Sequence, residues 1–113
     1  MLARVNRLVS VDDYRRLVRR GRRQSTSHLV VYFNKSSGFD SPRFGFIVAK
    51  TVGNAVHRNL VRRRLKALCH NALCTIPKGT DVVIRALTGS AQVGWDTLQA
   101  EIFEALDRGV EQE

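Results

Sequence analysis

Residues 50–66 read Lys-Thr-Val-Gly-Asn-Ala-Val-His-Arg-Asn-Leu-Val-Arg-Arg-Arg-Leu-Lys. The run Val52-Gly53-Asn54-Ala55 is typical of a turn, because Gly and Asn tolerate the positive φ that a strand-to-helix corner needs. From Val56 onward, at about 100° per residue, apolar and cationic side chains fall on opposite sides of a helix. This stretch therefore predicts a corner followed by an amphipathic helix.

The two faces of this predicted helix differ in what they can bury. The apolar side carries Val61, Leu65, Leu68, Cys69 and Ala72, and the opposite side carries Asn59, Arg63, Lys66 and His70, with Arg62 at the edge. The pairs Arg58/Arg62 and Arg62/Lys66 place like charges at i,i+4, which weakens a helix by roughly 0.2–0.5 kcal/mol per pair. A solvated face usually mixes signs. Uncompensated cations therefore favour a polyanionic partner.

The charge of the whole chain is distributed unevenly. The formal net charge is +9; residues 1–66 hold 16 Lys and Arg against 3 Asp and Glu, whereas residues 67–113 hold 3 against 7. Fifteen of the 19 cations are Arg, the residue suited to bidentate phosphate contacts and to stacking. This distribution is the electrostatic footprint of a nucleic-acid-binding protein.

Composition narrows the class of protein further. A chain of 113 residues with 43% hydrophobic content predicts one folded domain over residues 1–113. No apolar run is long enough to span a membrane, and the first residues lack the apolar stretch of a signal peptide. We therefore expect a cytoplasmic location and no membrane partner.

The remaining chain alternates between helices and strands. We expect a first helix, capped by Ser10 or Asp12, that runs to about Arg20 and stops at Gly21. After it we expect an edge strand within 21–27, a strand over 28–33, a loop over 34–42, a strand over 43–49, the helix from Val56 to about 74, a strand over 81–87 and a helix from about 95 to 108. The strands over 28–33 and 43–49 suit an antiparallel hairpin. The strand over 81–87 is expected to be central and parallel to an earlier one, because a helix connects them.

These elements predict an α+β fold with the order α-β-β-β-α-β-α, a sandwich of helices against one sheet. The acids of the last helix are expected to face solvent. In the first helix Val11, Tyr14, Leu17 and Val18 form an apolar stripe among arginines. For Tyr14 the sequence leaves two roles open, which are packing in the core and stacking on an unpaired base.

No set of side chains predicts a protein active site. The acids before residue 67 are Asp12, Asp13 and Asp40, and the histidines at 28, 57 and 70 lie on different elements or faces. Cys69, His70 and Cys74 suggest a zinc site only weakly, because no second ligand pair lies nearby and Cys69 falls on the apolar face. The residues therefore indicate a binding protein without catalytic or metal-ligating groups of its own.

Several of these residues also resemble a known family. Phe44-Gly-Phe-Ile-Val-Ala-Lys50, Val52-Gly-Asn-Ala-Val56, Arg58-Asn59, Val61 and Arg63-Arg64-Leu65 keep the spacing of the signature of the bacterial ribonuclease P protein subunit. The chain departs from that signature at Ile47, Thr51 and Leu60, where the family has Ser, Lys and Arg. The resemblance covers nearly the whole chain.

The resemblance implies a fold and a task. The family is known for a left-handed βαβ crossover, although about 98% of such crossovers are right-handed. Its protein joins a large catalytic RNA that, with Mg²⁺ held mainly by the RNA, cleaves precursor tRNA to form the mature 5′ end. The implied partners are the catalytic RNA and precursor tRNA, with no DNA, and the free protein is expected to be a monomer.

The resemblance also implies two RNA-contacting surfaces. The residues that match the catalytic-RNA surface are Lys50, Asn54, Arg58, Asn59, Arg62, Arg63 and Lys66. The residues expected to hold the single-stranded 5′ leader, in a cleft between the first helix and the sheet, are Arg7, Tyr14, Arg15, Val18, Arg19, Tyr32 and Ile47. The alternative is a basic structural protein of another ribonucleoprotein, such as the ribosome, which would share the charge and the architecture.

Overall fold

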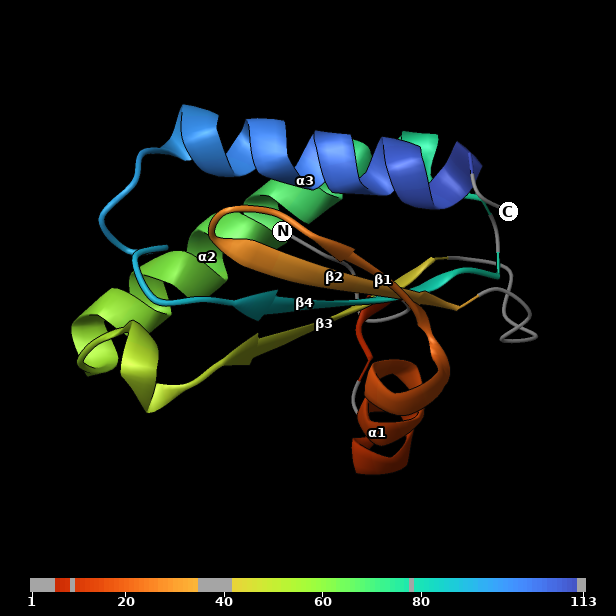
Figure 1. Ribbon diagram of the computed structural model, residues 1–113, viewed down its shortest axis with the longest axis horizontal. Helices are drawn as coiled ribbons and strands as arrows, with labels where there is room; N and C mark the ends of the chain where they lie inside the picture. Colours follow the sequence, from red (N-terminus) through yellow and green to blue (C-terminus); the bar gives the residue numbers. More distant parts are fainter. Residues whose placement is uncertain (1–5, 9, 35–41, 78, 112–113) are drawn as a thin grey trace.

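The structure is a computed structural model that describes residues 6–8, 10–34, 42–77 and 79–111 (Figure 1). Its elements are α1 (Val11–Arg20), β1 (Arg22–Ser25), β2 (Leu29–Asn34), β3 (Arg43–Val48), the 3₁₀ turn η2 (Lys50–Val52), α2 (Ala55–Ala72), the 3₁₀ turn η3 (Leu73–Thr75), β4 (Asp81–Ala86) and α3 (Trp95–Glu111). This order confirms the predicted α+β class. Most of the loop expected over 34–42 lies outside the described residues.

The four strands form one sheet in the order β1-β2-β4-β3. The central strand β4 runs parallel to β3 and antiparallel to β2, as the sequence predicted for this strand. The predicted hairpin between β2 and β3 is wrong, because β4 lies between them. Val82, Val83 and Ile84 are all fully buried, and a strand that is apolar on both sides belongs in the middle of a sheet.

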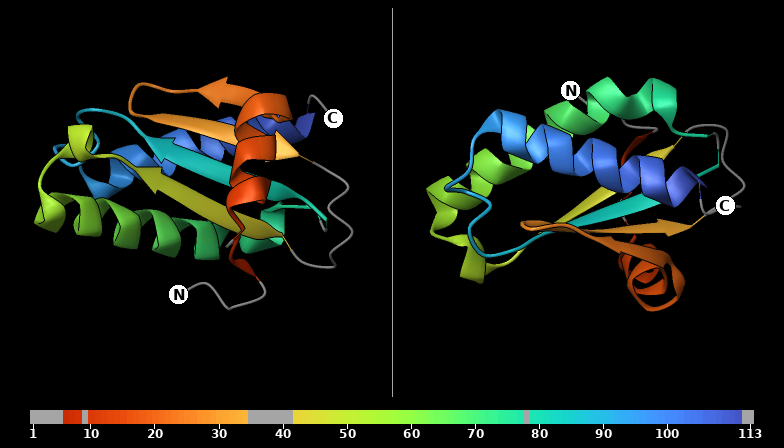
Figure 2. Two further views of the ribbon diagram at one scale, coloured as in Figure 1. Left: turned by 90° about the horizontal axis from the view of Figure 1, so that it is seen from below. Right: turned by 45° about the horizontal axis from the view of Figure 1, so that its top comes forward.

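The crossover from β3 through α2 to β4 is left-handed. In the left panel of Figure 2, seen from the side of α1, β3 and β4 both point to the left and β4 lies above β3. With both strands turned to point up, β4 is to the right of β3 from this side and to the left of it from the side of α2. A right-handed crossover would have the opposite arrangement.

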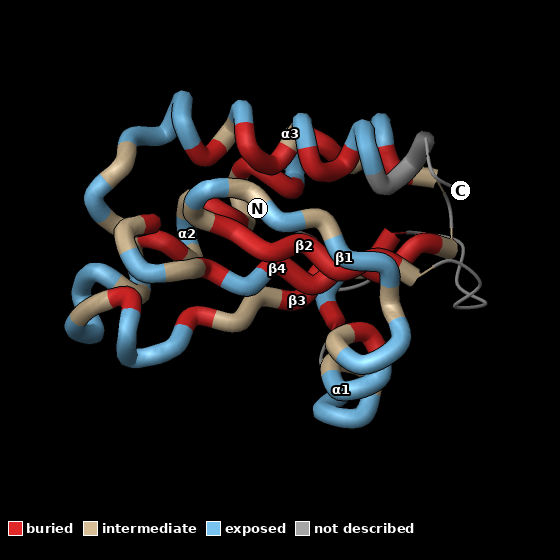
Figure 3. Tube along the Cα trace, viewed as in Figure 1, coloured by how far each residue is buried: buried red, intermediate tan, exposed pale blue. Residues whose placement is uncertain are grey.

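The sheet is buried on both faces because its strands alternate between two hydrophobic clusters. Leu29, Val31 and Phe33 of β2 pack in the large cluster with α2 and α3. Val30 and Tyr32 of β2 pack in a smaller cluster with α1. Figure 3 shows the buried residues following the sheet, α2 and α3. The predicted layer of helices against one face of the sheet is formed by α2 and α3, and α1 covers part of the other face.

A buried ionic network joins α1 to the sheet. The Asp81 side chain is 0% exposed and accepts hydrogen bonds from Arg43 Nε at 2.9 Å and Nη2 at 2.8 Å. The hydrogen bond to Asp81 raises the pKa of Arg43. Asp13 of α1 accepts from Arg16 at 2.8 Å and lies 3.6 Å from Arg43 Nη1. The network therefore places the start of α1 beside the first residues of β3 and β4.

One prediction about α3 is wrong. Asp96, Glu104 and Asp107 are exposed as expected, but Glu101 is only 8% exposed. Its Oε1 accepts from Thr26 Oγ1 at 2.5 Å and from the His28 backbone N–H at 2.7 Å, and its Oε2 lies 2.7 Å from His28 Nδ1. Burial acts to raise the pKa of Glu101, but the hydrogen bonds together lower it below its ordinary value. Glu101 thus fastens α3 to the turn between β1 and β2.

Two observations concern other classes of site. No helix within the described ranges is long and apolar enough to cross a membrane. The same residues contain no group of three His, Cys, Asp or Glu side chains that could hold a metal ion.

Cys69 is fully buried, and burial raises the pKa of its thiol, which agrees with the predicted structural role. Nothing is described of the Cys74 side chain.

We expect Glu101→Gln to lower the free energy of unfolding at pH 7 by about 2 kcal/mol, the typical contribution of hydrogen bonds to a charged group. A glutamate whose pKa is lowered by folding stabilises the protein fully above its unfolded pKa of about 4.3. That stabilisation is lost as the pH falls through the lower, folded pKa. Urea unfolding at pH 7 and at a pH below 4 should therefore show the difference from the native sequence shrinking in acid.

Glu104→Gln is the matched control, because Glu104 is exposed and pairs along α3 with Arg108. Such i,i+4 pairs contribute about 0.3–0.5 kcal/mol. An equal loss in both variants would contradict the role assigned to Glu101.

Candidate nucleic-acid interface

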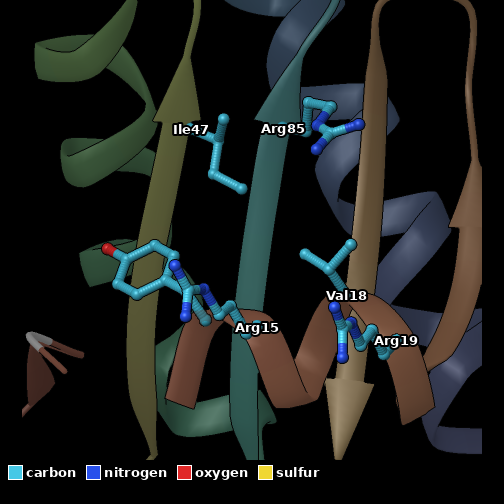
Figure 4. Close-up of a pocket in the computed structure, with 6 residues that line it drawn as sticks. Arg15, Val18, Arg19, Ile47 and Arg85 are labelled. Atoms are coloured by element: carbon cyan, nitrogen blue, oxygen red, sulfur yellow. The ribbon is translucent and has the colours of Figure 1, made fainter. Parts of the chain in front are cut away.

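A cleft lies between α1 and the sheet. Its volume is about 240 Å³, and its lining residues are Tyr14, Arg15, Val18, Arg19, Ile47 and Arg85. Four of these come from α1, whereas Ile47 comes from β3 and Arg85 from β4. Figure 4 shows Ile47 and Arg85 on one side of this space and Arg15, Val18 and Arg19 on the other. The structure therefore brings together five of the seven residues predicted for the leader cleft.

Tyr14 is held against β3 by two local features. Its hydroxyl accepts a hydrogen bond from the Phe46 backbone N–H at 3.1 Å. A Cβ atom at Gly45 would lie 2.5 Å from Tyr14 Cζ, so only glycine leaves room for the ring there. The ring packs on the smaller hydrophobic cluster and also lines the cleft. The packing role left open by the sequence is thus present, and the ring still borders the space where a ligand would lie.

The cleft has a cationic rim. Arg15, Arg19 and Arg85 are exposed, and no residue in the described part of the chain forms a hydrogen bond or ion pair with their side chains. The space between them is bordered by Val18 and Ile47, which are half-buried. An apolar floor with unpaired guanidinium groups around it suits a ligand that has flat bases and anionic linkages.

Two residues predicted for the cleft lie outside its lining. Tyr32 is 4% exposed and packs beneath α1 in the smaller cluster with Leu17 and Val83. Arg7 is exposed and forms a parallel bridge with Phe44 at the outer edge of β3. Tyr32 supports the cleft from below, and Arg7 lies beside the strand that carries Ile47.

Arg85 lines the cleft but was not among the residues predicted for it. Its neighbours Ile84 and Ala86 are buried, whereas Arg85 is exposed on the same central strand. The pairing register places it opposite Val30 of β2 and Ile47 of β3, on the face that carries α1. An arginine inside an otherwise apolar strand was the available signal. This signal alone could not place Arg85 in the cleft, because the strand register decides which residues lie beside it.

The second surface is the cationic face of α2. A shallow hollow of about 400 Å³ is lined by Val56, Asn59, Arg62, Arg63 and Lys66. Four of these were predicted; Val56 was not, and its side chain is 74% exposed. An exposed valine among cations gives this face one apolar spot. Lys50 and Asn54 are exposed and Arg58 is half-buried, and all three lie at or before the first turn of α2, outside this lining.

The start of α2 follows from the predicted corner. Gly53 has a φ of 154°, which favours glycine. Asn54 has an ordinary φ and is the N-cap, since its side chain accepts from the His57 backbone N–H at 3.0 Å. This cap satisfies one of the free N–H groups in the first turn. Of the two residues predicted to tolerate positive φ, Gly53 turns the chain and Asn54 caps the helix.

Asn59 orients one of the arginines. Its Oδ1 accepts from Arg62 Nη1 at 3.2 Å, and Arg62 Nη2 lies 3.5 Å from the Val48 carbonyl at the end of β3. Arg64 points elsewhere and donates to the Val93 carbonyl at 3.0 Å, which fastens the segment before α3. Leu60 is half-buried and lines neither surface.

Comparison with known proteins identifies similar sequences along nearly the whole chain. The family model described as "Ribonuclease P" matches residues 2–109. The ribonuclease P protein component of Clavibacter michiganensis is 53% identical over 110 residues, covering 97% of each chain. That of Rhodococcus opacus is 40% identical over 114 residues, covering 96% of this chain and 91% of the relative.

Solved structures show the same fold. The RNase P protein of Thermotoga maritima superposes with a TM-score of 0.80 at 26% identity, covering 90% of this chain and 96% of that one. The RNase P protein of Staphylococcus aureus superposes with a TM-score of 0.82 at 24% identity, covering 90% and 93%.

The contact between Gly45 and Tyr14 generates a prediction. Gly45→Ala should lower the free energy of unfolding by about 1–3 kcal/mol, the usual effect of overpacking, because the new methyl group would displace the Tyr14 ring. In a Tyr14→Ala background the same substitution should have little further effect. A double-mutant cycle by urea unfolding measures this coupling.

Gly94→Ala serves as the control, since a Cβ atom there would meet nothing within 4 Å. Additive effects of Gly45→Ala and Tyr14→Ala would show that the ring does not depend on the glycine.

Proposed function

The chain belongs to the ribonuclease P protein family, the protein component of a tRNA-processing endoribonuclease, and from that premise we propose that its two cationic surfaces bind two different RNAs. The cleft lined by Tyr14, Val18 and Ile47 receives the single-stranded 5′ leader of precursor tRNA. The cationic face of α2 binds the catalytic RNA. The RNA performs the cleavage, and the protein increases affinity for the substrate.

The observation that carries this proposal is the cleft beside α1. Single-stranded nucleic acid is bound by combining stacking surfaces for bases with cations along the backbone. The cleft offers the fixed Tyr14 ring, the apolar side chains Val18 and Ile47, and the unpaired guanidinium groups of its rim. Ile47 and Val18 make the cleft more aliphatic than an all-aromatic stacking site. We therefore expect weak base preference and a strong dependence on salt.

The face of α2 suits a different kind of contact. Arg62 is held in place by Asn59 and the Val48 carbonyl, and a pre-oriented guanidinium suits bidentate binding of phosphate. Arg63 and Lys66 extend the same face. Such contacts neutralise phosphates without reading bases, so they fix position on a folded RNA. The like-charge pairs along α2, unfavourable in isolation, favour binding when a polyanion lies against them.

We place the Mg²⁺ that the reaction needs on the catalytic RNA. In the part of the protein that the structure describes, His, Cys, Asp and Glu do not gather in threes to offer a metal site. The two surfaces are joined by β3, because Ile47 lines the cleft and the carbonyl of the next residue, Val48, lies beside Arg62. This proximity favours a substrate leader held next to the catalytic RNA. No observation favours the ribosomal alternative.

The decisive experiment incubates precursor tRNA and Mg²⁺ with the protein, the cognate catalytic RNA, or both. We expect no cleavage by the protein alone, and an increase in kcat/KM at low Mg²⁺ when the protein joins the RNA. Cleavage by the protein alone would contradict an RNA-borne catalytic centre. The absence of any increase would contradict the proposed role in substrate binding.

The division between the surfaces gives a second prediction. Arg63→Ala should weaken assembly with the catalytic RNA and reduce the slope of log K against log salt by about 1, the effect of one lost phosphate contact. Tyr14→Ala should leave assembly intact and weaken binding of leader-containing substrate by about 1–3 kcal/mol, the contribution of one stacked base.

Titrations of catalytic RNA with protein, and of the assembled enzyme with precursor or mature tRNA, separate the two steps. Arg108→Ala, on α3, is the control for loss of one positive charge. Equal effects of Arg63→Ala and Tyr14→Ala on the same step would refute the two-surface division.

A further inference from the structure

Arg85 occupies an unusual place for an arginine. It lies on the central strand β4, between the buried Ile84 and Ala86. Across the sheet its direct neighbours are Val30 of β2, which is buried, and Ile47 of β3, which lines the cleft. A central strand is held on both sides by its ladder, so the start of this side chain is fixed more firmly than one on a loop or a helix end.

The surroundings of Arg85 leave its charge unpaired. Of the residues that the structure describes, none gives Arg85 an ion pair or a hydrogen bond. Figure 4 shows its side chain extending from β4 toward β2, away from Ile47. Arg15 and Arg19 stand on the opposite side of the cleft, on α1. Cations therefore border the apolar floor from two sides.

This arrangement constrains how a single strand can lie. A chain that followed α1 alone would meet Arg15 and Arg19 and would leave Arg85 without a partner. A chain that crosses the floor meets cations on both sides of the bases that rest on Val18 and Ile47. Because the Arg85 head lies toward β2, beyond the floor, it is placed for the strand's backbone rather than for the base on the floor.

We propose that Arg85 binds a backbone phosphate of the leader on the side of the cleft opposite α1, so that the strand crosses the cleft from α1 toward the end of β4. The proposal rests on the proposed function of the cleft and adds a phosphate contact and a direction. Arg85 is then a positioning residue, which holds the leader without reading its sequence.

The test measures binding of the assembled enzyme, with its catalytic RNA, to precursor tRNA and to mature tRNA under non-cleaving conditions over a range of salt. The ratio of the two affinities isolates the leader. Arg85→Gln should reduce the slope of the logarithm of this ratio against log salt by about 0.7, the value for one phosphate of a single strand. With equal affinities at 1 M salt as the reference, this slope corresponds to about a fourfold loss of leader-dependent affinity at 0.15 M salt. Arg85→Lys should keep the slope.

Arg108→Gln is the matched control, because it removes one charge from α3, which covers the other face of the sheet. Urea unfolding checks that Arg85→Gln leaves the fold unchanged, and Arg85→Lys tests the charge in a second variant. The expected result is a reduced slope in Arg85→Gln alone.

Three results would overturn the proposal. An unchanged slope in Arg85→Gln, with leader dependence lost in Tyr14→Ala, would keep the leader cleft but remove Arg85 from it. An unchanged slope with an altered preference among leader sequences would assign Arg85 to a base edge. An equal slope change in Arg108→Gln would show a general effect of net charge. Failure of the proposed function itself looks different, since the native enzyme would then bind precursor and mature tRNA equally.

Discussion

The buried pair between Asp81 and Arg43 is the interaction on which the rest of the arrangement depends. Asp81 opens the central strand and has no access to water, so its carboxylate needs the two hydrogen bonds from Arg43. Removing one partner of such a pair leaves a buried charge, at a cost of about 3–5 kcal/mol. The pair sets the start of β4 beside the start of β3. Through Asp13 and Arg16 it also holds α1 against the face where the cleft forms.

The two faces of the sheet carry hydrophobic clusters of different size. The large cluster with α2 and α3 contains most of the buried apolar side chains. The smaller cluster under α1 is sufficient to hold one short helix, and it leaves the end of the sheet beyond α1 accessible. Gly45 lets the Tyr14 ring lie across β3, and the ring in turn provides a hydrogen-bond acceptor for that edge strand. The cleft therefore exists because α1 covers only part of its face.

The buried acids and the exposed arginines of the cleft differ in whether the protein itself neutralises their charge. The acids that the fold buries, Asp81 and Glu101, are each surrounded by donors that stabilise their charge. Arginines that line the cleft have no such partners among the residues that the structure describes. Like charges that repel one another in the free protein become favourable contacts when phosphates lie between them. Relief of this repulsion would therefore contribute to the free energy of RNA binding.

The sequence by itself determined the type and order of the helices and strands, their approximate bounds, and the two faces of α2, because periodicity and caps act between residues close in the chain. Only the tertiary structure decided which strands are neighbours. In the tertiary structure β4 lies between β2 and β3, Glu101 is buried, and Arg85 lies at the cleft beside Ile47. Strand order and register are set by contacts between residues far apart in the chain, where burial of both faces of β4 outweighs the local preference for a hairpin.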